Sequence, residues 1–161
     1  MRIGIAGHRT LGDEAAWAWV EETFHELLTT VETPLLGVTA LAPGSEQLFA
    51  RVVLRCGGKL HAVIPFVGYH HALATAVERA AYEALLAEAK VEQLGGGRGD
   101  AEAGWEVGKR VVDLSDELVA VWDGTPSAGR GDVAEVVEYA LLTQVPLVQL
   151  NPLARTTERL R

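Results

Sequence analysis

The sequence is poor in cysteine, since Cys56 is the only one among its 161 residues. A single thiol excludes a disulfide within the chain and a zinc site built from several cysteines. No apolar run approaches the roughly 18–20 residues that a membrane-spanning helix needs. The first residues, MRIGIAGHRT, pass from a short apolar run straight into a polar turn, which is not typical of a signal peptide. We therefore expect a cytoplasmic protein without a membrane partner.

Positive charge is also scarce. The chain has 14 Lys and Arg against 22 Asp and Glu, a formal net charge of −8. A surface that binds nucleic acid normally carries a basic stripe, so this composition predicts no nucleic-acid partner. It remains compatible with a small anionic ligand, because backbone N–H groups and one or two arginines can hold such a ligand whatever the net charge.

The apolar content of 48% is high enough for the chain to bury a hydrophobic core. Its length corresponds to one domain. We expect a single domain over residues 1–152, followed by a polar C-terminal tail over residues 153–161. No internal repeat is visible.

Short apolar runs alternate along the chain with amphipathic segments. The expected strands are 2–6, 35–41, 59–66, 90–94, 117–122 and 146–150, and the expected helices are about 13–29, 45–56, 73–89, 101–115 and from 132 onward. The strands are solidly apolar rather than alternating, which is typical of a parallel sheet covered on both faces. The sequence thus predicts an α/β protein: a Rossmann-like three-layer αβα sandwich with a mainly parallel central sheet.

In such folds the ligand lies beyond the carboxyl ends of the strands, which points to the loops 7–9, 42–46, 65–71 and 123–132. In the first loop Gly7 permits close approach of a ligand to the backbone, and Arg9 offers donors suited to phosphate or carboxylate. His8 either contacts a ligand or satisfies backbone groups locally. In the second loop Gly44 and Ser45 leave the first N–H groups of a helix open to an anion, or Ser45 only caps that helix.

The segment 129–135 follows the strand 117–122 and opens a helix. Its Gly129, Arg130 and Gly131 are candidates to surround a phosphate, although the endings of a P-loop and of a dinucleotide fingerprint are both missing. Asp132 is an unfavourable neighbour for a phosphate but a natural helix cap. Glu135 lies one turn inside the helix, where it is a candidate for contact with a ribose or for acid–base chemistry.

Trp122, Asp123 and Gly124 end the strand 117–122. Trp122 is a candidate to stack on a base or to pack against a helix, and Asp123 is a candidate to bind a ribose. His70 and His71 are adjacent and have no third ligand nearby at a metal-like spacing. We therefore expect no metal site and no resident cofactor.

Four segments in this order resemble the SLOG superfamily: IAGHRTL, LAPGSEQLFA, LHAVIPF and SDELVAVWDGTPSAGRGDVAEVVEYA. This group of Rossmann-like proteins unites the LOG phosphoribohydrolases, the DprA/SMF DNA-processing proteins and many predicted nucleotide sensors. The resemblance covers about residues 1–150 and is to the stand-alone, sensor-like branch.

The resemblance implies a pocket for a nucleotide or a nucleotide-derived ligand, including one derived from NAD. Related folds often dimerise through helices, so a homodimer is a candidate assembly. By position, the resemblance implies that the first loop contributes Gly7, His8 and Arg9 to the pocket and that the second loop contributes Gly44 and Ser45. It also implies that the phosphate is surrounded by Asp123, Gly124 and residues 129–131. Glu135 matches the glutamate on the family's helix. Where the family commonly has Gly-Gly-Thr-x-Glu, this chain has GDVAE at 131–135, which argues against tight phosphate binding there. The Pro-Gly-Gly-x-Gly-Thr stretch of the LOG enzymes is absent in full form.

Three functional hypotheses remain open. The first is a sensor or regulatory domain that binds a nucleotide-like small molecule without turning it over. The second is an enzyme that cleaves the N-glycosidic bond of a nucleotide, with Glu135 acting at the ribose and Arg9 or Arg130 holding the phosphate. The third is a scaffold with a degenerate pocket that acts through self-association. The sequence has no recognisable nucleophile or metal cluster, which favours the first.

Overall fold

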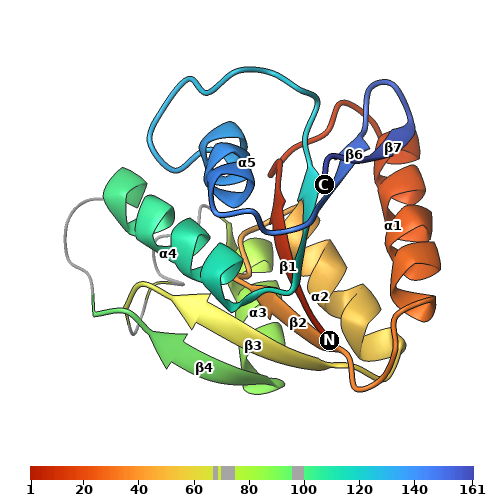
Figure 1. The fold of residues 1–161 in the computed structure, drawn as a ribbon. Helices are drawn as coiled ribbons and strands as arrows, with labels where there is room; N and C mark the ends of the chain where they lie inside the picture. The colour runs from red at the N-terminus through yellow and green to blue at the C-terminus, as the bar shows by residue number, and fades with distance from the viewer. Residues whose placement is uncertain (67–68, 70–74, 96–99) are drawn as a thin grey trace.

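Seven strands in the order β4-β3-β2-β1-β5-β6-β7 form one sheet in the computed structural model, which describes residues 1–66, 69, 75–95 and 100–161 (Figure 1). The strands are β1 (Arg2–Gly7), β2 (Leu36–Thr39), β3 (Lys59–Ile64), β4 (Ala89–Gln93), β5 (Glu117–Val121), β6 (Leu147–Asn151) and β7 (Thr156–Arg159). The helices are α1 (Glu14–Thr29), α2 (Ser45–Arg55), α3 (Ala76–Ala87), α4 (Asp100–Leu114) and α5 (Val133–Leu142). β1 to β6 run parallel, and β7 alone is antiparallel.

The helices cover both faces of the sheet (Figure 1). α1, α2 and α3 pack over one face, where Phe24, Phe49 and Tyr82 are almost fully buried against Ile3 and Ile5 of β1. α4 and α5 pack over the other face, through a cluster that is mostly valine and alanine. The predicted three-layer αβα sandwich with a mainly parallel sheet is confirmed.

The sheet has one topological switch point, between β1 and β5. From β1 the chain builds β2, β3 and β4 on one side, then crosses through α4 to place β5 on the other side of β1. Gly7 at the end of β1 pairs with Val121 at the end of β5, so the loops that follow these two strands start side by side. This edge is where an open α/β sheet leaves a crevice for a ligand.

The end of the chain differs from the expectation of a polar tail over 153–161. Asn151 Oδ1 accepts the N–H groups of Leu153 and Ala154, at 3.0 and 3.1 Å, and Arg155 adopts a left-handed φ of 56°. This tight turn returns the chain alongside β6, so residues 156–159 become the edge strand β7. The segment is polar and exposed, and residues 156–159 within it are hydrogen-bonded to β6 as an edge strand.

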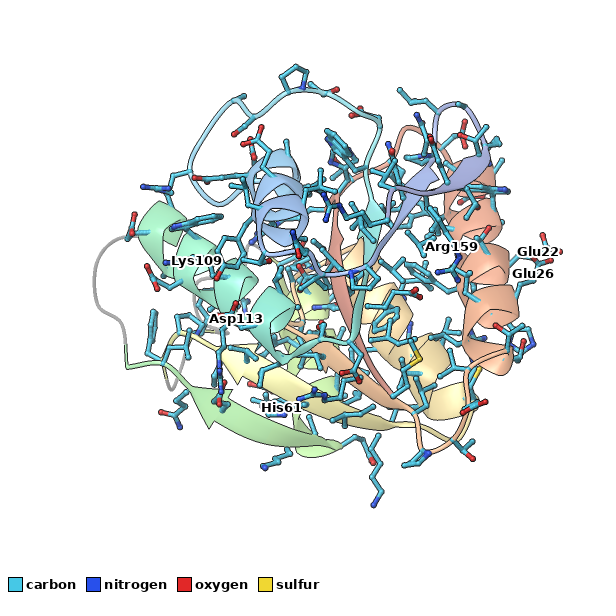
Figure 2. The ribbon with its side chains drawn as sticks, viewed as in Figure 1. Glu22, Glu26, His61, Lys109, Asp113 and Arg159 are labelled. Atoms are coloured by element: carbon cyan, nitrogen blue, oxygen red, sulfur yellow. The ribbon has the colours of Figure 1, made fainter. Side chains whose placement is uncertain are left out.

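We predict that Arg159→Ala lowers the free energy of unfolding by about 1–2 kcal/mol, because it leaves a nearly buried carboxylate without its partner. Arg159, on β7 (Figure 2), donates from Nη1 to Glu117 Oε2 at 2.6 Å, and only 12% of the Glu117 side chain is exposed. Arg159 itself is largely exposed, so the loss is smaller than for a fully buried pair.

Urea denaturation of this variant is compared with that of Arg161→Ala. Arg161 is exposed and makes no ion pair with the described residues, so its replacement is expected to leave stability almost unchanged. Equal midpoints for the two variants would show that the Glu117–Arg159 pair contributes nothing.

Candidate functional site

A cavity of about 390 Å³ opens at the switch point, on the α4 and α5 side of the sheet. Its walls come from the end of β1 and the loop after it, the loops after β2, β3 and β5, and the facing sides of α4 and α5. The surface is mainly apolar, with a few polar side chains at the strand ends. The polar or aromatic lining residues are His8, Arg9, Glu46, Tyr69, Trp122, Thr125 and Asp132.

The structure brings about half of the sequence candidates to this cavity. Gly7, His8, Arg9, Trp122, Gly131 and Asp132 line it. Gly44, Ser45, Asp123, Gly124, Gly129, Arg130 and Glu135 do not. The loops after β1, β2 and β5 therefore converge as expected, but many of their polar groups are turned toward one another instead of toward the cavity.

Gly44 and Ser45 hold the loop after β1 in place. The Ser45 hydroxyl donates to the carbonyl oxygen of His8 at 2.6 Å, and the Ser45 N–H donates to the same oxygen at 3.2 Å. The N-cap of α2 is Gly44, not Ser45, with a φ of 86° and no room for a side chain, since a Cβ there would lie 2.2 Å from the oxygen of Arg9. The hydroxyl and the N–H of Ser45, which were candidates to bind an anion, thus both donate to the His8 carbonyl.

His8 and Asp123 connect the ends of β1 and β5. The N–H of Asp123 donates to Nε2 of His8 at 3.3 Å, and the Asp123 carboxylate lies 3.4 Å from the same nitrogen. Asp123 also accepts the N–H of Thr125 at 2.9 Å. The hydrogen bonds from Thr125, together with the nearby His8 side chain, hold the pKa of Asp123 below its ordinary value. Asp123 is therefore engaged in shaping the loop, and it lies outside the cavity lining.

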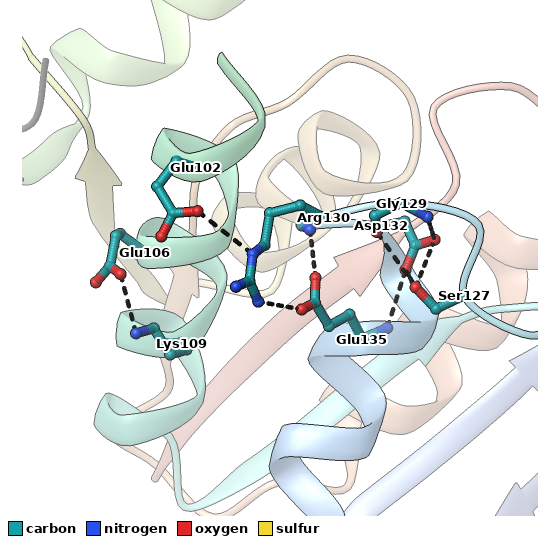
Figure 3. A network of polar contacts seen from close by, with 9 residues as sticks. Glu102, Glu106, Lys109, Ser127, Gly129, Arg130, Asp132 and Glu135 are labelled. Carbon is teal, nitrogen blue, oxygen red and sulfur yellow. Dashed lines mark hydrogen bonds and ion pairs between the residues drawn. The ribbon is translucent and has the colours of Figure 1, made fainter. Parts of the chain in front are cut away.

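The carboxylate of Asp132 occupies the anion position at the start of α5 (Figure 3). It accepts the N–H groups of Ala128, Gly129 and Glu135, at 2.8, 3.1 and 3.0 Å, and the hydroxyl of Ser127 at 3.0 Å. Convergent N–H groups at a helix N-terminus are the usual receptor for a phosphate. In this chain the receptor is filled by its own carboxylate, so Asp132 is the cap that the sequence predicted and also an obstacle to phosphate.

Arg130 and Glu135 face α4 on the outside of this loop (Figure 3). Arg130 pairs with Glu135 and with Glu102, and its guanidinium lies 5.2 Å from the centre of the Trp105 ring. Glu135 also accepts the N–H of Gly131. Neither side chain lines the cavity, because both are used to dock the loop onto α4.

The sequence did not predict that Arg9 and Glu46 would line the same cavity. Glu46 was included in the loop 42–46 but was not a candidate site residue, and it lines the cavity together with Arg9. Burial raises the pKa of Glu46, and the N–H of Ala42 and the charge of Arg9 oppose that rise. Within the described residues the Arg9 guanidinium makes neither a hydrogen bond nor an ion pair. A cation without a close partner is thus placed at the cavity.

The wall formed by α4 was also missed. One side of this helix lines the cavity, with the i, i+1, i+4, i+5, i+8 spacing of a helical face: Ala103, Gly104, Val107, Gly108 and Val111. A side chain at Gly104 would meet nothing within 4 Å, so the missing side chain leaves open space. The sequence does contain small residues at helical spacing here. Without the structure, however, the two glycines indicate only a weak helix and not the wall of a cavity.

The expectation that no metal is bound rests partly on His70 and His71, which lie outside the described residues. Among residues 1–66, 69, 75–95 and 100–161, no group of three or more potential metal ligands comes together. No helix in the same part of the chain combines the length and apolarity that a membrane span requires.

Comparisons with known proteins give structural likenesses only, since no family model and no curated protein matches the sequence. DNA processing protein A (DprA) from Streptococcus pneumoniae aligns over 92% of this chain with a TM-score of 0.68 and 14% identity. DprA from Helicobacter pylori aligns over 92% with a TM-score of 0.66 and 14% identity. The Moco carrier protein from Chlamydomonas reinhardtii aligns over 93% with a TM-score of 0.56 and 19% identity.

These likenesses define the fold class. The chain shares a Rossmann-like α/β fold with DprA and the Moco carrier protein, and this is the fold that the sequence predicted. It spans 49% of the S. pneumoniae DprA chain, 64% of the H. pylori DprA chain and 75% of the Moco carrier chain.

The prediction of no nucleic-acid partner is contradicted by one of these structures. The H. pylori DprA structure is described as showing a single-stranded DNA binding mode, on a chain that shares this fold over 92% of the present sequence. The physical reason for the error is that the net charge of −8 describes the whole chain. It does not determine which charges surround one groove or one loop.

We predict that Asp132→Ala lowers the free energy of unfolding at neutral pH by about 2 kcal/mol, at the upper end of the range for N-caps. Burial by itself would raise the pKa of Asp132, but the N–H and hydroxyl donors around it outweigh burial and lower the pKa. A carboxylate with a lowered folded-state pKa stabilises above its unfolded pKa of about 4, and this stabilisation is lost as pH falls through the folded value. The difference between wild type and variant should therefore shrink below about pH 4.

Asp13→Ala is the matched control, because Asp13 caps α1 by accepting a single described N–H, that of Ala16 at 2.7 Å. Its expected cost is about 1 kcal/mol in the same denaturation experiment. A loss for Asp132→Ala no larger than that for Asp13→Ala would contradict the multiple hydrogen bonding of Asp132.

Proposed function

We propose that this chain binds a nucleotide or a nucleotide-derived ligand in the switch-point cavity, and that it acts as a sensor or regulatory domain. The observation that carries the proposal is the position of Arg9. Its guanidinium makes no hydrogen bond or ion pair with the described residues, and it lies at a cavity of about 390 Å³ where the loops after β1 and β5 meet. A cavity of this size and place is the usual ligand site of an open α/β sheet.

The walls of the cavity suit a flat ring system. Trp122 lines one part, and its indole N–H donates to the Thr125 oxygen at 2.9 Å, which fixes the ring in place. Tyr69 lines another part. Next to α4 there is additional open space, because Gly104 has no side chain. Apolar and aromatic surface with a few fixed polar groups is typical of sites for small organic ligands.

The phosphate of such a ligand is expected at Arg9 and away from the start of α5. The carboxylate of Asp132 already accepts the donors there, and its charge repels a second anion. Arg9 offers planar paired donors that match a phosphate. In this arrangement the ligand enters with its anionic group toward the loop after β1.

The similar structures support this class of ligand without identifying it. One is described for its single-stranded DNA binding, and others are named as proteins that carry or bind the molybdenum cofactor, from C. reinhardtii and from Rippkaea orientalis. Because their sequences are at most 20% identical to this chain, they guide the choice of compounds to test and not the choice of residues.

The geometry gives less support to N-glycosidic cleavage by Glu135. Its carboxylate is held by Arg130 and by the N–H of Gly131, and Glu135 is not part of the cavity lining. A general base has to come within hydrogen-bond reach of the group it deprotonates. Binding is therefore the function that we propose.

Thermal shift against nucleoside monophosphates, NAD-derived compounds, molybdopterin-type cofactors and a short oligodeoxynucleotide tests the proposal. We expect at least one compound to stabilise the wild type, by about 2.7 kcal/mol at a hundred times its dissociation constant. Gly104→Leu should reduce this shift, because its side chain would take up part of the space next to α4. No shift with any compound would contradict the proposed function.

Gly104→Ala is the control for that variant. Both substitutions replace a helical glycine and should raise the melting temperature of the free protein, since alanine and leucine favour the helix by up to about 1 kcal/mol. The leucine side chain is larger than the alanine methyl group and takes up more of the ligand space. Equal ligand-induced shifts in both variants would place the ligand elsewhere.

We further predict that Arg9→Ala weakens binding of a nucleoside monophosphate by about tenfold or more and leaves binding of the matching nucleoside almost unchanged. The reason is that a charge-assisted hydrogen bond to phosphate is lost in the first case only. Isothermal titration calorimetry measures both affinities. Arg51→Ala, on the exposed side of α2 and outside the cavity, is the control. A parallel loss for nucleotide and nucleoside would contradict a phosphate role for Arg9.

A further inference from the structure

Glu46 stands in the first turn of α2, and its carboxylate turns back to the loop after β2. Its Oε2 accepts the N–H groups of Ala40 and Ala42, at 3.1 and 3.2 Å, and lies 3.5 Å from the hydroxyl of Thr39. All these donors meet the same oxygen. They fix the carboxylate in one orientation and leave its second oxygen for another partner.

That second oxygen, Oε1, takes no hydrogen bond from the described residues. It is also absent from the fully buried polar side-chain atoms that lack a hydrogen bond in the described part of the chain, so it is not completely enclosed. Since Glu46 lines the cavity, Oε1 is an acceptor that remains open to a ligand there. Burial raises the pKa of Glu46, while the N–H of Ala42 and the charge of Arg9 oppose that rise.

A fixed carboxylate oxygen discriminates between the edges of purine bases. Guanine presents an N1–H beside a 2-amino group, so two neighbouring donors face an acceptor. Hypoxanthine keeps the N1–H and lacks the amino group. Adenine presents the unprotonated N1 beside its 6-amino group, so a lone pair faces the carboxylate and repels it.

We propose that Glu46 is the specificity-determining residue of the cavity, and that its Oε1 accepts N–H groups from a guanine-type base while Arg9 holds the phosphate. This inference rests on the proposed nucleotide binding. It names the class of base, because an open acceptor at this position favours a base edge that carries N–H donors.

A purely structural role for Glu46 is the competing interpretation, and Glu46→Gln separates the two. The glutamine oxygen still accepts from Ala40 and Ala42, so the loop after β2 keeps its hydrogen bonds. The glutamine NH₂ replaces Oε1 and turns the open acceptor into a donor. A structural role predicts unchanged nucleotide binding, whereas a specificity role predicts a changed preference.

The experiment is isothermal titration calorimetry of wild type and Glu46→Gln with GMP, IMP and AMP. We expect the wild type to bind GMP about tenfold or more tightly than AMP, with IMP between them, because charge-assisted hydrogen bonds are lost in turn. Glu46→Gln should weaken GMP binding by about tenfold or more and should not weaken AMP binding. Glu78→Gln is the matched control, because Glu78 also lies in a first turn and accepts one N–H, that of Thr75, at 3.1 Å.

A second measurement needs no variant of the protein. 1-Methyl-GMP lacks the N1–H and should bind the wild type at least about tenfold more weakly than GMP. Equal affinities for GMP, AMP and 1-methyl-GMP, or unchanged GMP binding by folded Glu46→Gln, would overturn the role of Glu46 alone. If none of the nucleotides binds the wild type, the proposed nucleotide function fails, and this inference fails with it.

Discussion

The contact between the loop after β1 and the first turn of α2 is the constraint on which the site depends. The His8 carbonyl accepts both the hydroxyl and the N–H of Ser45, and the absence of a side chain at Gly44 lets Arg9 pass close by. This contact fixes where β1 ends relative to α2. It thereby brings Arg9, from one loop, and Glu46, from the other, to the same cavity.

Charge in the site is divided between groups that are satisfied internally and groups that are left open. Asp132 and Glu135 are neutralised by backbone donors and by Arg130, so the start of α5 is closed to further anions. Arg9 and one oxygen of Glu46 are not satisfied in this way. In the proposed function, one cation and one acceptor on the side of β1 and β2 would therefore bind the ligand, and the α5 side would contribute the shape of the cavity.

The fold was predictable because it depends on local patterns, and the site was predictable only in part. Solid apolar runs identified the strands, and Asp132 was identified as a cap because a cap is a local feature. The orientation of Glu46 was not predictable, since a glutamate in a first turn faces either solvent or the preceding loop according to tertiary packing. The return of the chain into β7 depends on a left-handed Arg155, which arginine rarely adopts.

The edge strand β7 has a consequence for the behaviour of this protein at high concentration. An unpaired strand edge is a template on which other chains add strands and form aggregates. β7 ends this side of the sheet with Glu158 and Arg159, and β4 ends the other side with Lys90 and Glu92. Each border of the sheet therefore carries ionic groups of both signs, and stacking of strands from neighbouring molecules along either border is disfavoured.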